Sequence, residues 1–218
     1  CKYSDMAVFS LHPVKAISAG EGGVITTNNY DMYKQLIKLR SHGINKDNDE
    51  LVNAESYENN VIKPWVYEMQ TLGFHYRITD IQCALANSQL QKLDLFISKR
   101  KTLAKKYIEA LKKIDNLTPA QQFSNEHAYH LFVIRLKFNK IGKTRSQVMK
   151  ALKDKGIITQ VHYIPVVNHP YYKNKGYNSE NLPNTNNYYS EALSLPLYYS
   201  LDESDQDYVI HCLKNIIT

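Results

Sequence analysis

A glycine-rich turn between two short apolar segments is the feature that most constrains this chain. Residues 7–10 (Ala-Val-Phe-Ser) and 24–27 (Val-Ile-Thr-Thr) are rich in β-branched and apolar side chains, which favour strands. Between them lies Gly20-Glu21-Gly22-Gly23, and glycine adopts the backbone conformations that sharp turns need. The pattern indicates a hairpin-like element whose first strand is short and buried.

Ser10 and Lys15 follow the first of these segments and bring reactive groups to its end. A lysine in a protected place has a lowered pKa because burial disfavours the ammonium form, and a neutral amine can form a Schiff base with an aldehyde. The Ser10 hydroxyl could hold a phosphate, which the glycines would let the backbone approach. A strand, a turn and an exposed lysine are the alternative, because short motifs have many false matches.

Two capping boxes predict where helices begin. Thr79 and Gln82 open a long helix, whose apolar residues recur at helical spacing until about residue 115. Thr144 and Gln147 open a second helix, which Gly156 ends. The other expected elements are a helix capped by Asn28 or Asn29, a polar surface excursion over 44–68, strands over 130–138 and 157–163, and a last helix from about 202 to 217.

Composition and charge exclude several classes of protein. The net charge of +6 is spread along the chain, whereas polyanion binding needs a concentrated patch, so we expect no nucleic-acid partner. The three cysteines form no CxxC or Cys/His cluster, which argues against a zinc site and for a reducing, cytoplasmic location. No apolar run approaches the length of a membrane span, so we expect no membrane partner.

The stretch from Ser10 to Lys15 (Ser-Leu-His-Pro-Val-Lys), followed by Gly20-Glu21-Gly22-Gly23, resembles the lysine motif of the DegT/DnrJ/EryC1/StrS sugar aminotransferases. These are fold-type I enzymes that depend on pyridoxal 5′-phosphate (PLP). Further segments fall in the family's order and extend the resemblance over nearly the whole chain: 39–43, 64–70, 72–82, 161–166 and 193–197.

The resemblance implies roles for six residues. Lys15 would carry PLP as a Schiff base and act as general base and acid, and Ser10 would bind the cofactor phosphate. Many members carry Asn at the position of His75, where the side chain reaches the cofactor phosphate of the partner subunit; a helix-entry residue is the alternative for His75. Arg77 is a candidate carboxylate or phosphate partner, or a structural salt bridge. His162 and Tyr163 would line the sugar pocket, or belong to a buried strand.

The segment Pro64-Trp65-Val66-Tyr67-Glu68 resembles one subgroup in particular, the transaminases of the pseudaminic-acid pathway. It implies transfer of an amino group from L-glutamate to C4 of a UDP-linked 4-keto-6-deoxy-N-acetylhexosamine. The family resemblance also implies a homodimer. Another nucleotide keto-sugar is one alternative, and a non-catalytic remnant or interaction module is another. A sugar dehydratase of the same fold would carry histidine at the lysine position, and Lys15 argues against it.

The family resemblance and a change in sequence texture near residue 115 predict two domains. Residues 1–115 would be the C-terminal part of the PLP-binding large domain, including a long linking helix, and 116–218 a small α/β domain. The family's N-terminal half would precede Cys1, and it supplies the groups that stack on the cofactor ring and pair with its nitrogen. We therefore expect a fragment that alone binds PLP poorly and has no useful turnover.

Overall fold

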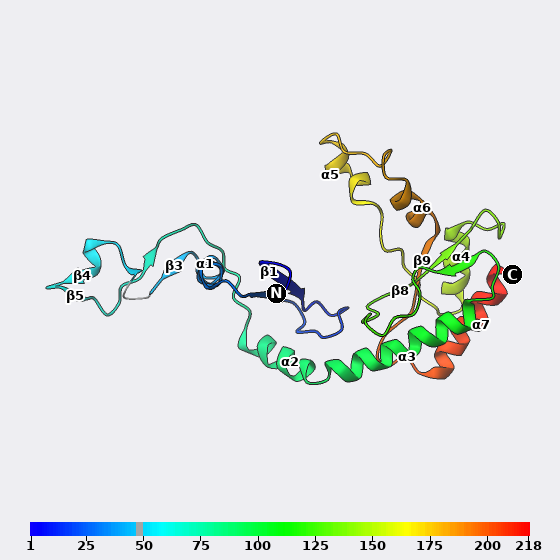
Figure 1. Ribbon diagram of the computed structural model, residues 1–218, viewed down its shortest axis with the longest axis horizontal. Helices are drawn as coiled ribbons and strands as arrows, with labels where there is room; N and C mark the ends of the chain where they lie inside the picture. Colours follow the sequence, from blue (N-terminus) through cyan, green and yellow to red (C-terminus); the bar gives the residue numbers. More distant parts are fainter. Residues whose placement is uncertain (47–49) are drawn as a thin grey trace. The chain divides into compact units, whose positions relative to one another are not determined.

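A computed structural model describes residues 1–46 and 50–218 and separates them into two compact units, Cys1–Gln91 and Lys92–Thr218 (Figure 1). Both units mix helices and short antiparallel strands. No helix among the described residues is both long and apolar enough to cross a lipid bilayer. The division after residue 115 that we predicted for the domains stays a prediction.

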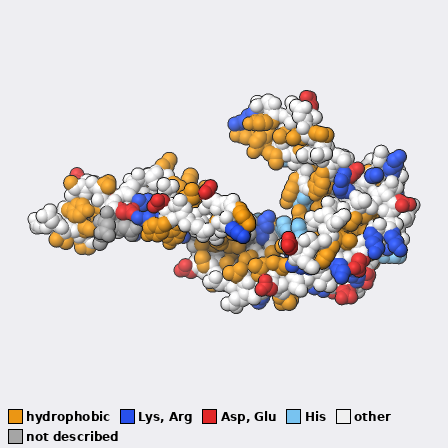
Figure 2. All heavy atoms as spheres, in the orientation of Figure 1, with side chains coloured by type: hydrophobic (Ala, Val, Ile, Leu, Met, Phe, Trp, Pro, Cys, Tyr) orange, Lys and Arg blue, Asp and Glu red, His pale blue; other side chains and the backbone are white. Residues whose placement is uncertain are grey.

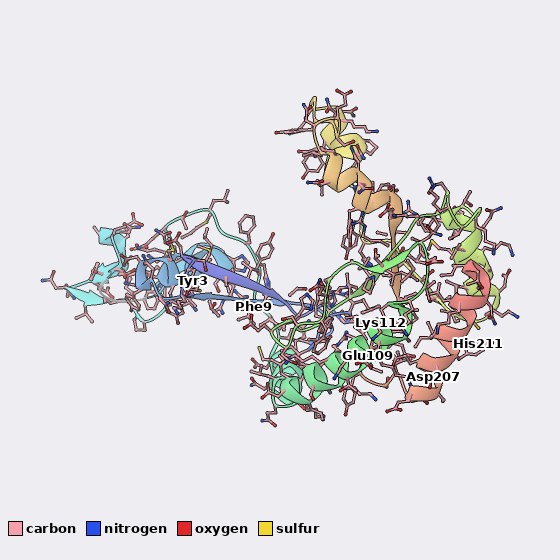
Figure 3. The ribbon with its side chains drawn as sticks, turned by 45° about the vertical axis from the view of Figure 1, so that its right-hand side comes forward. Tyr3, Phe9, Glu109, Lys112, Asp207 and His211 are labelled. Carbon is pink, nitrogen blue, oxygen red and sulfur yellow. The ribbon has the colours of Figure 1, made fainter. Side chains whose placement is uncertain are left out.

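The first unit begins with the predicted hairpin. Strand β1 (Met6–Ser10) pairs antiparallel with β2 (Gly23–Thr27), in a register that joins Met6 to Thr27 and Ser10 to Gly23. The predicted burial of β1 is wrong: Val8 is 70% exposed and Phe9, labelled in Figure 3, is 54% exposed. The reason is that burial needs a covering layer, and no described residue supplies one on these faces.

Helix α1 (Tyr30–Arg40) follows, capped by Asn29, whose side chain accepts from the N–H groups of Asp31 and Met32. The polar excursion after it contains more regular structure than we predicted, although its residues 47–49 lie outside the described part of the chain. Its elements are β3 (Ile44–Asn45) paired with β6 (Glu68–Met69), the 3-10 turn Ala54–Ser56, and the small hairpin of β4 (Tyr57–Glu58) and β5 (Val61–Ile62).

Helix α2 (Asp80–Leu90) closes the first unit, and helix α3 (Leu93–Leu111) opens the second. We predicted one continuous helix here, and that prediction is wrong. The break lies at Gln91 and Lys92, where the Lys92 backbone (φ −102°, ψ 1°) leaves the helical conformation, although apolar residues recur at helical spacing on both sides of it. The capping box of Thr79 and Gln82 at the start of α2 is confirmed.

The second unit is built on a three-stranded antiparallel sheet in the order β7-β8-β9. Its helices α3 and α7 lie side by side, with Glu109 on α3, Lys112 at the C-cap of α3, and Asp207 and His211 on α7 (Figure 3). The core joins buried residues of the sheet to those of α3, α4 and α7, and within it the rings of Tyr107 and Phe132 stack with centroids 4.8 Å apart. The elements after α3 are β7 (Leu117–Pro119), β8 (Phe132–Leu136), α4 (Arg145–Asp154), the 3-10 turn Val166–Asn168, α5 (Pro170–Lys173), α6 (Pro183–Glu191), β9 (Ala192–Leu195) and α7 (Glu203–Ile217).

The predicted strand over 157–163 does not form. Its backbone meets the sheet at one bridge, where Gln160 and Ser194 exchange hydrogen bonds of 3.3 and 2.7 Å. The apolar residues of this stretch have the composition that is typical of a strand, but the chain leaves the edge of β9 after this single bridge. The capping box of Thr144 and Gln147 at α4 is confirmed.

Candidate functional site

The loop between β1 and β2 holds Lys15 in a defined place. The Leu11 N–H donates to the Gly22 carbonyl at 2.9 Å, and the Ala19 N–H donates to the Leu11 carbonyl at 3.0 Å. The side chains of Leu11 and Ala19 are buried and anchor the loop from inside. Lys15 lies between these anchors, and its own N–H donates to the His12 carbonyl at 2.9 Å. The loop is therefore an ordered structure that carries a half-buried lysine.

The reactive groups of Lys15 and Ser10 are available to a ligand. In residues 1–46 and 50–218, the Lys15 amine has neither a hydrogen bond nor an ion pair. The Ser10 hydroxyl oxygen accepts one long hydrogen bond, 3.4 Å, from the N–H of His12. A free amine and a free hydroxyl on one ordered loop fit the aldehyde and the phosphate of PLP, so this part of the predicted site suits the cofactor.

The glycine turn closes against the residues that begin α2. Gly22 has a φ of +130°, and a Cβ placed on it would lie 2.7 Å from Cδ1 of Ile78. The Gln82 side chain, which also belongs to the capping box, donates to the Glu21 carbonyl at 3.1 Å. Position 22 therefore needs glycine for two reasons: its backbone conformation and the lack of space for a side chain. The residues at the start of α2 hold the glycine turn in the loop that carries Lys15.

His75 and Arg77 lie on an extended segment that pairs with the end of α1. His75 forms a bridge with Ser41, and the Tyr76 N–H donates to the Arg40 carbonyl at 2.9 Å. Both side chains are exposed, and Arg77 Nη2 lies 3.2 Å from His75 Nε2. The structure therefore brings these two predicted site residues into contact with each other.

A buried carboxylate, Glu68, organises the excursion after α1, and the sequence analysis assigned it no role. Glu68 is 9% exposed and accepts from the N–H groups of Val52 and Asn53, from the Ser56 hydroxyl at 2.7 Å and from the Gln70 amide at 3.0 Å. These donors, led by the Val52 N–H and then the Gln70 amide, lower the pKa of Glu68 to about 2.

Glu50 forms a second anionic centre nearby in the same unit. Its carboxylate pairs with the amines of Lys34 and Lys38, the latter at 2.9 Å. These two lysines lower the pKa of Glu50 to about 2. The two carboxylates accept hydrogen bonds from polar side chains of this unit, while hydrophobic side chains lie at the surface over β3 to β5 (Figure 2). In the sequence, the only sign of a buried carboxylate in this segment is that the acidic Glu68 lies between the apolar Tyr67 and Met69.

His162 and Tyr163 belong to the second unit, whereas the other four predicted site residues belong to the first. His162 is half-buried, and its Nδ1 shares a 2.7 Å hydrogen bond with the Ser194 hydroxyl on β9. Burial lowers the pKa of His162 from its ordinary value. Tyr163 is 66% exposed, and its ring meets that of His162 edge to face at 4.5 Å. The pair joins a fixed imidazole to a phenol that is open to a ligand.

Comparison with known proteins gives relatives along the whole chain. Residues 1–214 match the DegT/DnrJ/EryC1/StrS aminotransferase family. The spore coat polysaccharide biosynthesis protein SpsC of Bacillus subtilis is 37% identical over 216 residues, which are 98% of this chain and 54% of SpsC. Protein MJ1066 of Methanocaldococcus jannaschii is 32% identical with the same coverage. The chain thus spans about half the length of the curated relatives it matches.

Solved structures of sugar aminotransferases are also similar to this chain. PseC of Helicobacter pylori, an aminotransferase involved in the biosynthesis of pseudaminic acid, is similar with a TM-score of 0.86 and 25% identity, over 99% of this chain and 54% of PseC. The putative sugar aminotransferase Spr1654 of Streptococcus pneumoniae, in its pyridoxamine-phosphate form, gives a TM-score of 0.83 and 26% identity, over 98% of this chain and 53% of Spr1654. Spr1654 is also known in a PLP form.

These findings confirm the predicted fold class, part of a fold-type I PLP-dependent transferase. They also confirm the predicted cofactor class, because the aminotransferases of the family depend on PLP. The roles of the six site residues stay predictions. The match over residues 1–214 and the 37% identity to SpsC show that the chain belongs to the DegT/DnrJ/EryC1/StrS aminotransferase family.

Proposed function

We propose that this chain supplies the lysine-bearing part of a PLP-dependent aminotransferase that transfers an amino group from L-glutamate to C4 of a UDP-linked 4-keto-6-deoxy-N-acetylhexosamine. The observation that carries the proposal is the free Lys15 amine on its ordered loop, in a chain that matches the family over residues 1–214. The likeness to PseC favours a sugar of the pseudaminic-acid type. The 37% identity to SpsC keeps another nucleotide keto-sugar as the second candidate.

The chemistry divides between cofactor and protein. When bound, PLP would supply an electron sink for the donor carbon and a carrier for the amino group. Lys15 would hold the cofactor through its amine, and the same amine, when free, would take a proton from the α-carbon of the donor as a base and deliver it to the C4′ carbon of the cofactor as an acid. The Ser10 hydroxyl donates to the cofactor phosphate. The buried residues Leu11 and Ala19 keep the loop in place while Lys15 moves.

The other predicted residues take supporting roles in this proposal. His75 donates a hydrogen bond to the cofactor phosphate in the partner subunit of a homodimer. His162 and Tyr163 contact the sugar, with the imidazole held by Ser194 and the phenol exposed. Arg77 stands beside His75. We place the enzyme in the cytoplasm, where nucleotide sugars and glutamate are found together.

We further propose that the uncovered hairpin of β1 and β2 packs against a preceding half of the same enzyme. A two-stranded hairpin alone is marginally stable, and this one exposes Val8 and Phe9 on neighbouring positions. Relatives that match the whole of this chain are about twice as long. That half would supply the ring-stacking and nitrogen-pairing groups, so the chain alone would bind PLP poorly.

The test begins with the coding DNA upstream of the Cys1 codon, which we expect to encode an in-frame α/β half. The complete protein is then expressed with PLP, and the absorbance of the bound cofactor is followed as glutamate is added. We expect glutamate to change the spectrum in the wild type and to have no effect in Lys15→Ala. If the complete protein binds PLP and does not respond to glutamate, the aminotransferase proposal fails. If unrelated sequence lies upstream, a folded remnant becomes the better account.

A further inference from the structure

The contact between Arg77 and His75 fixes where the imidazole carries its proton. Arg77 Nη2 lies 3.2 Å from His75 Nε2. A guanidinium has donors only and keeps its charge at any pH a protein survives, so Nε2 must be the acceptor. A neutral imidazole that accepts at Nε2 carries its hydrogen on Nδ1, and an imidazolium, with hydrogens on both nitrogens, cannot make this contact. The position of the hydrogen follows from the chemistry of the pair.

We propose that Arg77 is a positioning residue that holds His75 as its neutral Nδ1–H tautomer, so that His75 donates to a phosphate oxygen through Nδ1. The inference rests on the proposed role of His75 at the cofactor phosphate. A phosphate oxygen accepts hydrogen bonds, so only the nitrogen that carries a hydrogen is useful to it. Among residues 1–46 and 50–218, Nδ1 of His75 has no hydrogen-bond partner, which leaves this donor open to a ligand.

The surroundings of the ring support a fixed orientation. The His42 ring meets the His75 ring edge to face, at 5.0 Å between centroids and 84° between planes. The His42 N–H donates to the Phe74 carbonyl at 2.8 Å, so the backbones that carry the two rings are tied together. His42 and Arg77 thus both limit the rotation of His75.

The tautomer also accounts for histidine at a position where the resemblance to the family implies asparagine. The amide nitrogen of asparagine and Nδ1 of histidine are both bonded to Cγ, so they lie the same number of bonds from the backbone. The Nδ1–H form therefore keeps the donor where asparagine places it, whereas the Nε2–H form moves it one bond further out. Arg77 selects the form that preserves the donor position.

The tautomer can be measured on this chain without cofactor or substrate. Long-range proton–nitrogen correlation spectra of the chain labelled at its eight histidines distinguish the two neutral forms and the imidazolium, and His75→Asn identifies the His75 signals by their loss. We expect Nδ1–H at neutral pH in the wild type and a shift to Nε2–H in Arg77→Ala. Arg40→Ala, a charge change on the adjoining segment, should leave the pattern unchanged. Nε2–H or imidazolium in the wild type, or no effect of Arg77→Ala, would overturn the proposal.

A second experiment on the complete enzyme separates positioning from direct ligand binding. Arg77→Ala should weaken PLP binding about tenfold when His75 is present, since a hydrogen bond to a charged group is lost. The same substitution should have no effect in the His75→Asn background, where no tautomer needs selecting. His75→Gln, which moves the amide outward, should also weaken binding about tenfold. A loss on Arg77→Ala that persists in His75→Asn would show that Arg77 binds the ligand itself and would overturn the proposal.

The two proposals fail in different ways. If no variant binds PLP, the proposed function fails, and the spectra on the isolated chain still decide the tautomer of His75. If PLP binds and the tautomer is Nε2–H, the enzyme proposal stands and the role given to Arg77 is wrong.

Discussion

Gly73 lies so close to Gly43 that neither position has room for a side chain: a Cβ placed on Gly73 would be 2.0 Å from the backbone nitrogen of Gly43. A Cβ on Gly43, whose φ is +69°, would be 1.7 Å from the Thr71 carbonyl oxygen. The neighbours in both cases are backbone atoms, which cannot turn away as a side chain would. This approach sets the segment of His42 beside the segment of His75.

Gly73→Ala is therefore expected to force the two segments apart and to destabilise the first unit by roughly 2–3 kcal/mol. Faster hydrogen exchange in peptides covering residues 38–46 and 70–78 would report the separation. Gly20→Ala is the matched control, because Gly20 has a φ of +80° with open space around it. Its cost should be about 1 kcal/mol from backbone strain alone. Equal effects of the two substitutions would show that the close approach contributes nothing.

The stability of the first unit should fall in acid through Glu68. Its pKa in the folded chain is about 2, below the ordinary value of 4.5, so the carboxylate stabilises the folded state above about pH 4.5. That contribution is lost as the pH falls from about 4.5 towards 2. In urea titrations from pH 7 to pH 2, Glu68→Gln should unfold earlier than the wild type at pH 7, and the difference should vanish near pH 2.

Glu50 titrates over the same range because its pKa is also about 2, so the difference between wild type and Glu68→Gln is what isolates Glu68. Glu58→Gln, on the exposed strand β4, is the control and should leave the urea midpoint unchanged at every pH. A stability gap between wild type and Glu68→Gln that stays constant down to pH 2 would contradict the assigned role of the carboxylate.

Local features could be predicted from the sequence because their causes are local. The capping boxes at Thr79 and Thr144 need only two residues three positions apart, and both form. The hairpin of β1 and β2 follows from two strand-forming segments and a glycine turn. The lysine loop was placed correctly for the same reason, since its hydrogen bonds run between residues 11 and 22.

Features that depend on distant partners could not be predicted. Glu68 accepts hydrogen bonds from residues 52–56 and from Gln70, and no spacing of residues in the sequence predicts these contacts. Residues 157–163 have the composition of a strand, yet β9 offers them only the bridge at Gln160. The Arg77–His75 contact joins residues only two positions apart, but it could not be predicted either, because it depends on side-chain rotamers, which a pattern of residue types does not contain.

Arg100 should matter more to the second unit than any other basic residue on α3. Its guanidinium is buried, and Nη1 donates to the carbonyls of Tyr129, His130 and Leu197 at 3.0–3.3 Å. These carbonyls flank β8 and β9, so Arg100 ties the helix to both strands. Arg100→Met would leave them without this donor, at a cost of roughly 3–5 kcal/mol.

Thermal or urea unfolding of the second unit measures that cost, and Lys105→Met is the control. Lys105 lies on the exposed face of the same helix, so replacing it should change the free energy of unfolding by less than about 0.5 kcal/mol. Similar losses in the two variants would mean that the buried guanidinium does not hold the strands.

Ser10 and Lys15 should affect the complete enzyme in different ways, because one is expected to bind the cofactor and the other to react with it. Ser10→Ala removes a donor to a charged phosphate, worth about 1.5 kcal/mol, so PLP binding should weaken about tenfold while turnover at saturating PLP falls little. Ser10→Thr keeps a hydroxyl at the same position and should bind PLP nearly as well as the wild type.

Lys15→Arg keeps the positive charge and lacks a nucleophilic amine, so it should abolish turnover at any PLP concentration. Equilibrium dialysis and glutamate-dependent turnover, measured side by side, separate the two effects. Full turnover in Lys15→Arg would remove Lys15 from the reaction, and unchanged PLP binding in Ser10→Ala would remove Ser10 from the phosphate site.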